Sequence, residues 1–274
     1  MKGGRAMKNL MALCAICILA MAVQNADAAR RKVRLNLDYA RMIPWNYALE
    51  YRSECVITEN NATSTVPTRV YCELSGVPSD MGDRFTFTVD SVAVSSDFYD
   101  AEKQASIVRK LTRGRFAVAL INGCPVVDTL STFSVSELSE WDMVIQFAKL
   151  LPDIPREPVR RGYSWDASGA FPLMTSLGKI PCEVYRLYQV DSLTSNGAFV
   201  HISWRFRYAA LHSAVDTSAV LKRVPVSGQG SGTAVIDAVN EILSEATVRF
   251  ETPVASYGGV RVKWVENTTL RYRR

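Results

Sequence analysis

Apolar and polar residues alternate along several stretches of this chain. In residues 200–208 the even-numbered positions are aliphatic or aromatic, and the odd-numbered ones are His, Ser or Arg. Residues 84–90 and 260–264 alternate in the same way. Because successive side chains of a strand point to opposite faces, this period of two predicts strands with one dry and one wet face. Residues 116–121 form another strand-like run and end in Asn122-Gly123, a strong signal for a hairpin turn.

Two stretches have the periodicity of a helix instead. Residues 100–111 and 136–151 each place apolar side chains on one side at helical spacing. Ser134 and Glu137 have the spacing of a capping box before the second stretch, and Pro152 follows its end. Strands outnumber helices, so the pattern predicts a mainly β protein with two or so short helices.

Short motifs recur in the two halves of the chain. An aromatic cluster, a Val-Asp-Ser triplet and an Ala-Val pair follow one another in each half: Trp45-Asn46-Tyr47, Val89-Asp90-Ser91 and Ala117-Val118 in the first, Tyr163-Ser164-Trp165, Val190-Asp191-Ser192 and Ala234-Val235 in the second. The first and last motifs keep nearly the same spacing, whereas the triplet falls at a different place in each half. Internal duplication and chance similarity are therefore both open.

The repeat bears on residues 233–247. Taken alone, they have the apolar spacing of an amphipathic helix through Val235, Val239, Ile242 and Ala246. Aligned with residues 116–132, they become two strands that turn near Asn240. The alignment favours the hairpin, and the helix is the alternative.

The first 28 residues have the layout of a cleaved export signal. Basic residues precede an unbroken apolar run of fourteen residues, Leu10 to Val23, and Ala26-Asp27-Ala28 offers small residues for cleavage. As a helix the run would span about 21 Å, less than the roughly 30 Å of a bilayer core. A short membrane anchor is the alternative. Cleavage would leave a mature chain of 246 residues (274 less 28) that starts at Ala29, in the periplasm or outside the cell.

Charge and hydropathy limit the partners of this mature chain. The formal net charge of +5 falls to +3 without the signal, and basic residues do not gather in one stripe. A nucleic-acid partner is therefore not expected. No later segment has eighteen consecutive apolar residues, so no membrane span is expected after the signal is removed. The sequence does not define an oligomeric state.

Four cysteines remain after the signal: Cys55, Cys72, Cys124 and Cys182. An even number in an exported protein favours disulfides, with three pairings open. We expect Cys55 to pair with Cys72, since each lies in a strand-like run beside a polar loop, and Cys124 to pair with Cys182. Zinc is disfavoured because the mature chain has no Cys-x-x-Cys motif and its two histidines have no ligand at metal spacing. No metal or cofactor is predicted.

Catalytic motifs are also missing. The glycine-rich run Gly228–Gly232 lacks the residues of a dinucleotide loop, a Walker loop or a nucleophile elbow, and is interpreted as a flexible turn. Asp90 and Asp191 are candidates for a pair of catalytic carboxylates, although turns after strands explain both. His201 and His212 would serve as general bases only if the fold brought a nucleophile to them. No catalytic residue is predicted.

A proline-rich segment divides the chain. Residues 152–160 contain three prolines, which fix φ and discourage helix, and are predicted to link β-rich halves at 29–151 and 161–274.

Around this linker the sequence resembles a family of exported bacterial proteins of unknown function with an "LP…PV..G.sW" centre. The matching residues are Leu151-Pro152, Pro158-Val159, Gly162 and Ser164-Trp165, followed later by Gly230, Gly232 and Ala234 to Asp237. The chain departs from the family at Tyr163, where an aspartate is usual, and at Asn240-Glu241, where a glycine is usual. The resemblance implies an antiparallel curved sheet or half-barrel in two related halves, akin to lipoprotein carriers. It transfers no catalytic residue.

These observations lead to one functional hypothesis and two alternatives. We expect a non-enzymatic secreted or periplasmic binding protein for an apolar or lipid-like ligand, or for an envelope protein. The aromatic residues available to line an apolar concavity are Trp45, Trp204, Phe206 and Trp264. The same aromatics would also serve as ordinary core. The alternatives are a structural or surface-assembly module of the envelope, and a hydrolase with an unrecognised site.

Overall fold

The computed structural model describes residues 31–37, 45–78, 84–121, 124–128, 143–175, 178–194, 196–210, 227–252, 255–257 and 259–273. The predicted signal peptide, the turn residues Asn122-Gly123, the capping-box pair and His212 lie outside these residues. The elements, in chain order, are β1 (Trp45–Glu59), β2 (Ala62–Pro78), β3 (Arg84–Ser96), α2 (Ala101–Leu111), β4 (Arg115–Ile121), β5 (Cys124–Asp128), α3 (Met143–Leu150), β6 (Ser164–Thr175), β7 (Gly178–Leu193), β8 (Phe199–Ala210), β9 (Ser227–Asp237), β10 (Ile242–Glu251), β11 (Ala255–Tyr257) and β12 (Val260–Arg273).

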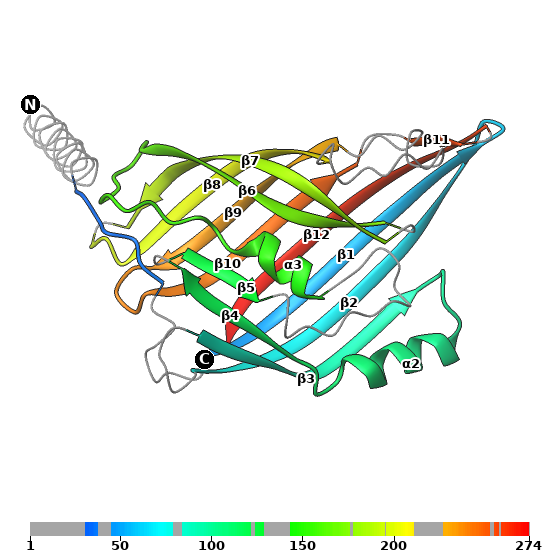
Figure 1. The fold of residues 1–274 in the computed structure, drawn as a ribbon, viewed down its shortest axis with the longest axis horizontal. Coiled ribbons are helices and arrows are strands. Elements are labelled where there is room, and N and C mark those ends of the chain that lie inside the picture. Colours follow the sequence, from blue (N-terminus) through cyan, green and yellow to red (C-terminus); the bar gives the residue numbers. More distant parts are fainter. Residues whose placement is uncertain are drawn as a thin grey trace, which may run out of the picture.

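All strands belong to one antiparallel, curved sheet of twelve strands (Figure 1). The strand order is β5-β4-β3-β2-β1-β12-β10-β9-β8-β7-β6, and the short β11 pairs with β12. The predicted class, mainly antiparallel β with two short helices, is confirmed. The β1–β12 pair joins the two halves from Asn46 opposite Arg273 to Thr58 opposite Arg261. One sheet therefore runs through both halves of the chain.

The strand order has an internal regularity. Read from one edge to the other, β5 to β1 and β10 to β6 both run in descending order, with β12 between them. A duplicated five-stranded meander would produce this arrangement. Two of the recurring motifs lie in equivalent strands under that scheme: the aromatic clusters start β1 and β6, and the Ala-Val pairs lie in β4 and β9. The Val-Asp-Ser triplets lie in β3 and β7, which are not equivalent.

The hairpin predicted for residues 233–247 is confirmed. β9 and β10 pair with Asp237 opposite Ile242, and the turn between them includes Asn240. Glu241 in this turn has a φ of 57°, a left-handed conformation that glycine adopts at least cost.

The interpretation of Gly228–Gly232 as a flexible turn was wrong, because these residues lie within β9. Each glycine faces an aromatic residue of β8: the pairs are Gly228 with Tyr208, Gly230 with Phe206 and Gly232 with Trp204. A Cβ atom added at any of the three would stand 2.2 Å from an atom of its partner's side chain. The rings thus occupy the space that other side chains would need, and the glycines are required by close packing.

The first helix forms where the sequence places it. Asp100 caps α2 by accepting a hydrogen bond from the Lys103 backbone N–H at 2.7 Å, and Ile107 and Leu111 are buried. The second predicted helix, 136–151, appears as α3 over Met143–Leu150, and its earlier residues lie outside the described part of the chain.

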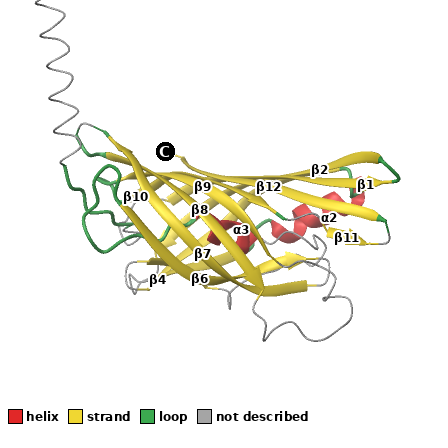
Figure 2. Ribbon diagram, turned by 90° about the horizontal axis from the view of Figure 1, so that it is seen from above, coloured by secondary structure: helices red, strands yellow, loops and turns green. Residues whose placement is uncertain are grey.

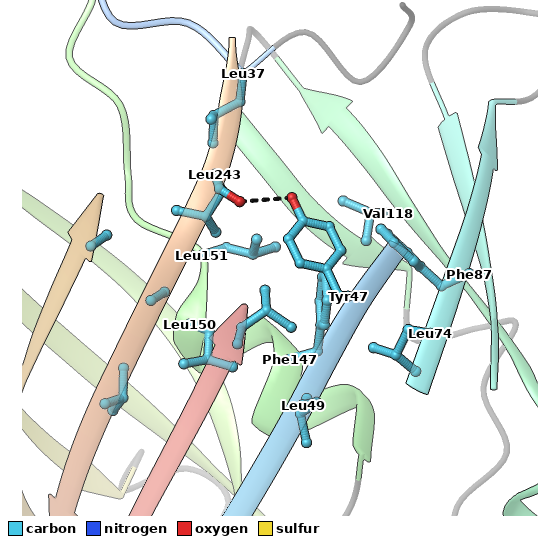
Figure 3. Packing of buried hydrophobic residues seen from close by; sticks show 14 of the residues in the cluster. Leu37, Tyr47, Leu49, Leu74, Phe87, Val118, Phe147, Leu150, Leu151 and Leu243 are labelled. Atoms are coloured by element: carbon cyan, nitrogen blue, oxygen red, sulfur yellow. Dashed lines mark hydrogen bonds between the residues drawn. The ribbon is translucent and has the colours of Figure 1, made fainter. Parts of the chain in front are cut away.

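Helix α3 lies inside the curve of the sheet (Figures 1 and 2). Its residues Phe147 and Leu150, with Leu151, pack among buried side chains of the inner face (Figure 3). Among these is Tyr47, whose ring lies 6.4 Å from that of Phe147 between centroids. The Tyr47 hydroxyl donates to the Leu243 carbonyl at 3.0 Å, next to the irregularity of β10 between Leu243 and Glu245. The helix and the inner face together form one continuous core.

A buried polar cluster fixes α3 to the middle of the sheet. Lys149 Nζ lies 3.1 Å from Glu266 Oε2, and the two side chains are 7% and 9% exposed. Gln146 donates to the same carboxylate oxygen at 3.4 Å and accepts from the Thr268 hydroxyl at 3.0 Å. Lys149 also lies 4.3 Å from the centre of the Phe250 ring. The charges are paired and hydrogen-bonded, which is the condition for burying them.

The segment after α3 is fixed to β6 and β7, at one edge of the sheet. The Asp153 carboxylate accepts hydrogen bonds from Arg186 at 3.0 Å and from the Tyr188 hydroxyl at 2.9 Å. Its backbone carbonyl accepts from the Trp165 indole N–H at 3.0 Å. The proline-rich segment is thus part of the fold, and Val159 at its end is fully buried.

Gly230→Ala should destabilise the protein by about 2 kcal/mol, because its Cβ would contact both the Phe206 ring and the Arg249 carbonyl. Thr233→Ala, on the outward face of the same strand, should change the unfolding free energy by less than about 0.5 kcal/mol. Urea denaturation measures both. Equal effects of the two substitutions would contradict the packing described here.

Lys149→Met should cost about 3 kcal/mol of unfolding free energy, because it leaves Glu266 buried without its cation. The double variant Lys149→Met/Glu266→Leu should recover most of this loss, since no charge remains to be compensated. Thermal and urea denaturation of wild type and both variants provide the comparison. A double variant less stable than the single one would rule out this explanation.

A candidate binding groove on the outer face

The four aromatic residues predicted to line a ligand cavity do not share one. Trp45, Trp204 and Phe206 are 0%, 3% and 6% exposed and belong to the core. The hollow beside Trp204 and Phe206 has a volume of about 10 Å³, too small for a ligand, because α3 covers it. Trp264 is half-buried and stacks on Phe98 at 6.1 Å between ring centroids. Trp45, Trp204 and Phe206 therefore serve as core, the alternative that the sequence left open.

The predicted Cys55–Cys72 disulfide is wrong. Within the β1–β2 pair, Cys72 stands opposite Leu49 and Cys55 stands opposite Val66. Six residues separate Leu49 from Cys55, so the two cysteines lie about 20 Å apart along the strands. A disulfide requires Cα atoms within about 7 Å of each other. Strand-like surroundings identified the hairpin, but the offset of the cysteines within it depends on the position of the turn.

The remaining cysteines are only partly described. Cys182 is buried on the inner face of β7, and the backbone of Cys124 begins β5. The side chain of Cys124 lies outside the described part, so the pairing of Cys124 with Cys182 stays a prediction.

Asp90 and Asp191 do not form a carboxylate pair. Each is the extra residue of a β-bulge: β3 skips Asp90 against β2, and β7 skips Asp191 against β8. Six strands separate β3 from β7 in the sheet. Asp90 accepts from the Ser75 hydroxyl at 3.0 Å and Asp191 from the Ser203 hydroxyl at 2.9 Å. The Val-Asp-Ser triplets are therefore bulges within strands, and the interpretation as turns after strands was also wrong.

His201 and Ser203 lie two residues apart on the same outward face of β8. In a catalytic triad the histidine accepts the serine proton and the carboxylate orients the histidine. Here Ser203 donates directly to Asp191, and His201 stands opposite Ser192. Within the described residues, no three His, Cys, Asp or Glu side chains gather as a metal site would require.

The larger hollows lie on the outer face of β6 to β10 and β12. One has a volume of about 1200 Å³ and the other about 570 Å³. They share Tyr185, Arg207, Gln229 and Glu251, so they form one continuous groove, which we call the outer groove. Side chains of β7 and β8 at these positions alternate with buried core residues, which places them on the face opposite to α3.

Each strand contributes a different chemistry to the outer groove. β7 contributes Tyr185 and Leu187, each 52% exposed, and β8 contributes Arg205 and Arg207. In the sheet register Tyr185 stands beside Arg207, and Leu187 beside Arg205. The floor and far wall carry Gln229 and Ser231 of β9 and Arg249 and Glu251 of β10. The groove thus has the apolar Tyr185 and Leu187 along one side, with the acidic Glu183 at one end, and the cationic Arg205 and Arg207 along the next.

The acidic residue in the middle of the groove is already neutralised. Glu251 accepts from Arg249 Nε at 2.9 Å and lies 3.4 Å from Lys263 Nζ. The hydrogen bond from Arg249 and the charge of Lys263 hold the pKa of the Glu251 carboxyl below its usual value. Glu251 is therefore ionised and paired with Arg249 and Lys263, and its charge does not neutralise the arginines of β8.

Sequence reasoning identified the wet face of residues 200–208 but did not recognise a site there. The signal was the alternation itself, which places Arg205 and Arg207 side by side on one face. Their apolar neighbours Tyr185 and Leu187 come from another strand, and only the β7–β8 register brings them together.

Comparison with known proteins gives no family. No protein-family model matches the chain, and no curated protein matches it. Solved structures of similar shape include the translocator domain of autotransporter NalP from Neisseria meningitidis (TM-score 0.30, 6% identity, 96% of this chain and 98% of that one). A DUF1329 family protein from Desulfovibrio piger matches with TM-score 0.19 and 12% identity over 92% of both chains. A LolA superfamily protein from Nitrosomonas europaea matches with TM-score 0.16 and 9% identity over 92% and 93% of the two chains. All three TM-scores lie below 0.5.

Neither α2 nor α3 has the length and apolar character that crossing a membrane requires, and no other helix occurs in the described part of the chain.

Burial raises the pKa of the Cys72 thiol from 9.0 to about 12. We therefore expect iodoacetamide at pH 9 to alkylate Cys72 much more slowly in the folded protein than in urea, since the thiolate is the reactive form. Only the protonated thiol is compatible with burial, so the burial of Cys72 costs the folded state no stability below pH 9.0. As the pH rises from 9.0 towards 12, the thiol ionises in the unfolded chain but not in the folded one, and the folded state loses stability. Peptide mass spectrometry follows the alkylation. Equal rates in the two states would show that the thiol is accessible.

Proposed function

We propose that this chain is an exported, non-enzymatic binding protein that holds an apolar or lipid-like ligand in the outer groove. The observation that carries the proposal is the position of Tyr185 and Leu187. They are two of the five large apolar side chains that are exposed in the described residues, and they are adjacent on one face of β7 within a continuous groove. Exposed apolar side chains that gather in a hollow are typical of a binding site.

The described part of the interior offers little room, so we assign the ligand to the other face. Helix α3 fills the curve, and the void beneath it is about 10 Å³. The two hollows of the outer groove, in contrast, have volumes of about 570 and 1200 Å³, within and somewhat above the range of small-molecule sites. We therefore assign the ligand to the outer groove, on the face of these strands opposite to the buried aromatic residues Trp204 and Phe206.

Two features support export and a role without catalysis. The sequence begins with a cationic, apolar and small-residue order typical of a cleaved signal. Ser203 donates directly to Asp191 at a bulge, so no histidine stands between the hydroxyl and the carboxylate as it does in a catalytic triad. A structural or surface-assembly role remains the second candidate, because the filled interior favours it.

The neutral fluorescent probe N-phenyl-1-naphthylamine should bind the purified protein, and Tyr185→Ser/Leu187→Ser should weaken binding about tenfold through lost apolar contact. The matched control is Val77→Ser/Val239→Ser, which removes two apolar side chains of 63% and 64% exposure outside the groove and should leave binding unchanged. Fluorescence titration measures all three.

Native mass spectrometry of protein taken from its own envelope tests the same proposal without a probe. A bound mass of lipid size on the wild type, lost in the Tyr185→Ser/Leu187→Ser variant, would support it. A bare mass together with no probe binding would favour the structural role.

A further inference from the structure

Two arginines on β8 stand next to each other on the wall of the outer groove. Arg205 and Arg207 are both exposed, and their Cα atoms are about 7 Å apart, as for any i, i+2 pair in a strand. Across β9 they face Ser231 and Gln229, which carry no charge. Across β7 they face Leu187 and Tyr185.

Four other outward arginines of this sheet are paired with carboxylates, whereas Arg69 and Arg261 are exposed and have no ion pair within the described residues. Arg52 pairs with Glu50, Arg249 with Glu251, Arg271 with Glu245 and Arg273 with Glu73. Within the described residues, no carboxylate lies in ion-pair distance of Arg205 or Arg207. The charged side chains that line the groove are Arg205, Arg207, Arg249, Lys263, Glu183 and Glu251. Four cations and two carboxylates leave two positive charges in excess.

We propose that Arg205 and Arg207 bind the phosphate group of an anionic amphiphile whose apolar part lies against Tyr185 and Leu187. This rests on the proposed function and names the chemistry of its ligand. A guanidinium group offers parallel N–H donors that match the oxygens of a phosphate. Two such groups on one wall suit a phosphate monoester, which has three terminal oxygens and up to two negative charges.

The polar floor of the groove fits the region between head and chain. Gln229 and Ser231 lie between the arginines of β8 and the Arg249–Glu251 pair of β10. An amide and a hydroxyl both donate and accept, so they match hydroxyl or ester oxygens next to a phosphate. The apolar wall is on the other side of the arginines, which gives the ligand a defined orientation across the strands.

The experiment compares decyl phosphate, decanoate and decanol, each below its micelle concentration, by isothermal titration calorimetry. Decyl phosphate should bind tightest and decanol weakest. Arg205→Ala/Arg207→Ala should weaken decyl phosphate about tenfold or more and leave decanol nearly unchanged. Arg205→Lys/Arg207→Lys keeps the charge but loses the paired donors, and should fall between wild type and the alanine variant.

The control variant Arg69→Ala/Arg261→Ala removes the same charge from exposed positions outside the groove and should behave as wild type. Equal affinity for decyl phosphate and decanol, or equal effects of the two alanine variants, would overturn the arginine assignment while leaving the proposed function intact. Decanoate binding as tightly as decyl phosphate would replace phosphate by a carboxylate. Binding of none of the three would overturn the proposed function itself.

Discussion

The inner face of the curved sheet is apolar and must be covered, and α3 covers it. A sheet with one hydrophobic face is stable only when a second layer buries that face. Phe147 and Leu150 of the helix supply part of the apolar layer, and the Lys149–Glu266 pair fixes its position. Within the described residues, this helix leaves the inner face little space for a ligand. The larger hollows are then left to the opposite face, where the side chains of β7 and β8 meet water.

Strand alternation carried most of the fold prediction, because burial of one face is a local property of the sequence. Residues 200–208 and residues 233–247 were predicted as strands and lie in β8, β9 and β10. The glycine run of β9 was misread because glycine is usual in turns. Glycine is needed in β9 because the aromatic rings of the paired strand β8 fill the space that a side chain would take. The local sequence of β9 does not show which residues of β8 it will face. The predicted disulfide failed for a similar reason, since register depends on where the hairpin turns.

The candidate site was less predictable than the fold. Arg205 and Arg207 were recognised as a polar face, but a polar face is the default for an exposed strand. What distinguishes them is the apolar pair Tyr185 and Leu187 on one neighbouring strand and the uncharged pair Gln229 and Ser231 on the other. Both facts depend on which strands become neighbours. The two Val-Asp-Ser triplets show what a local motif does determine. Each forms a β-bulge at its aspartate, but the two bulges lie in separate strands and do not form a common site.

The N-terminal segment of the described chain is built into the body of the protein. Val33 and Val159 exchange two backbone hydrogen bonds of 2.8 Å, and Leu35 and Leu37 are buried in the core. The residues just beyond the predicted cleavage position therefore need a partner that is synthesised more than a hundred residues later. Because synthesis starts at the N-terminus, this segment emerges first and docks only after the middle of the polypeptide has been made.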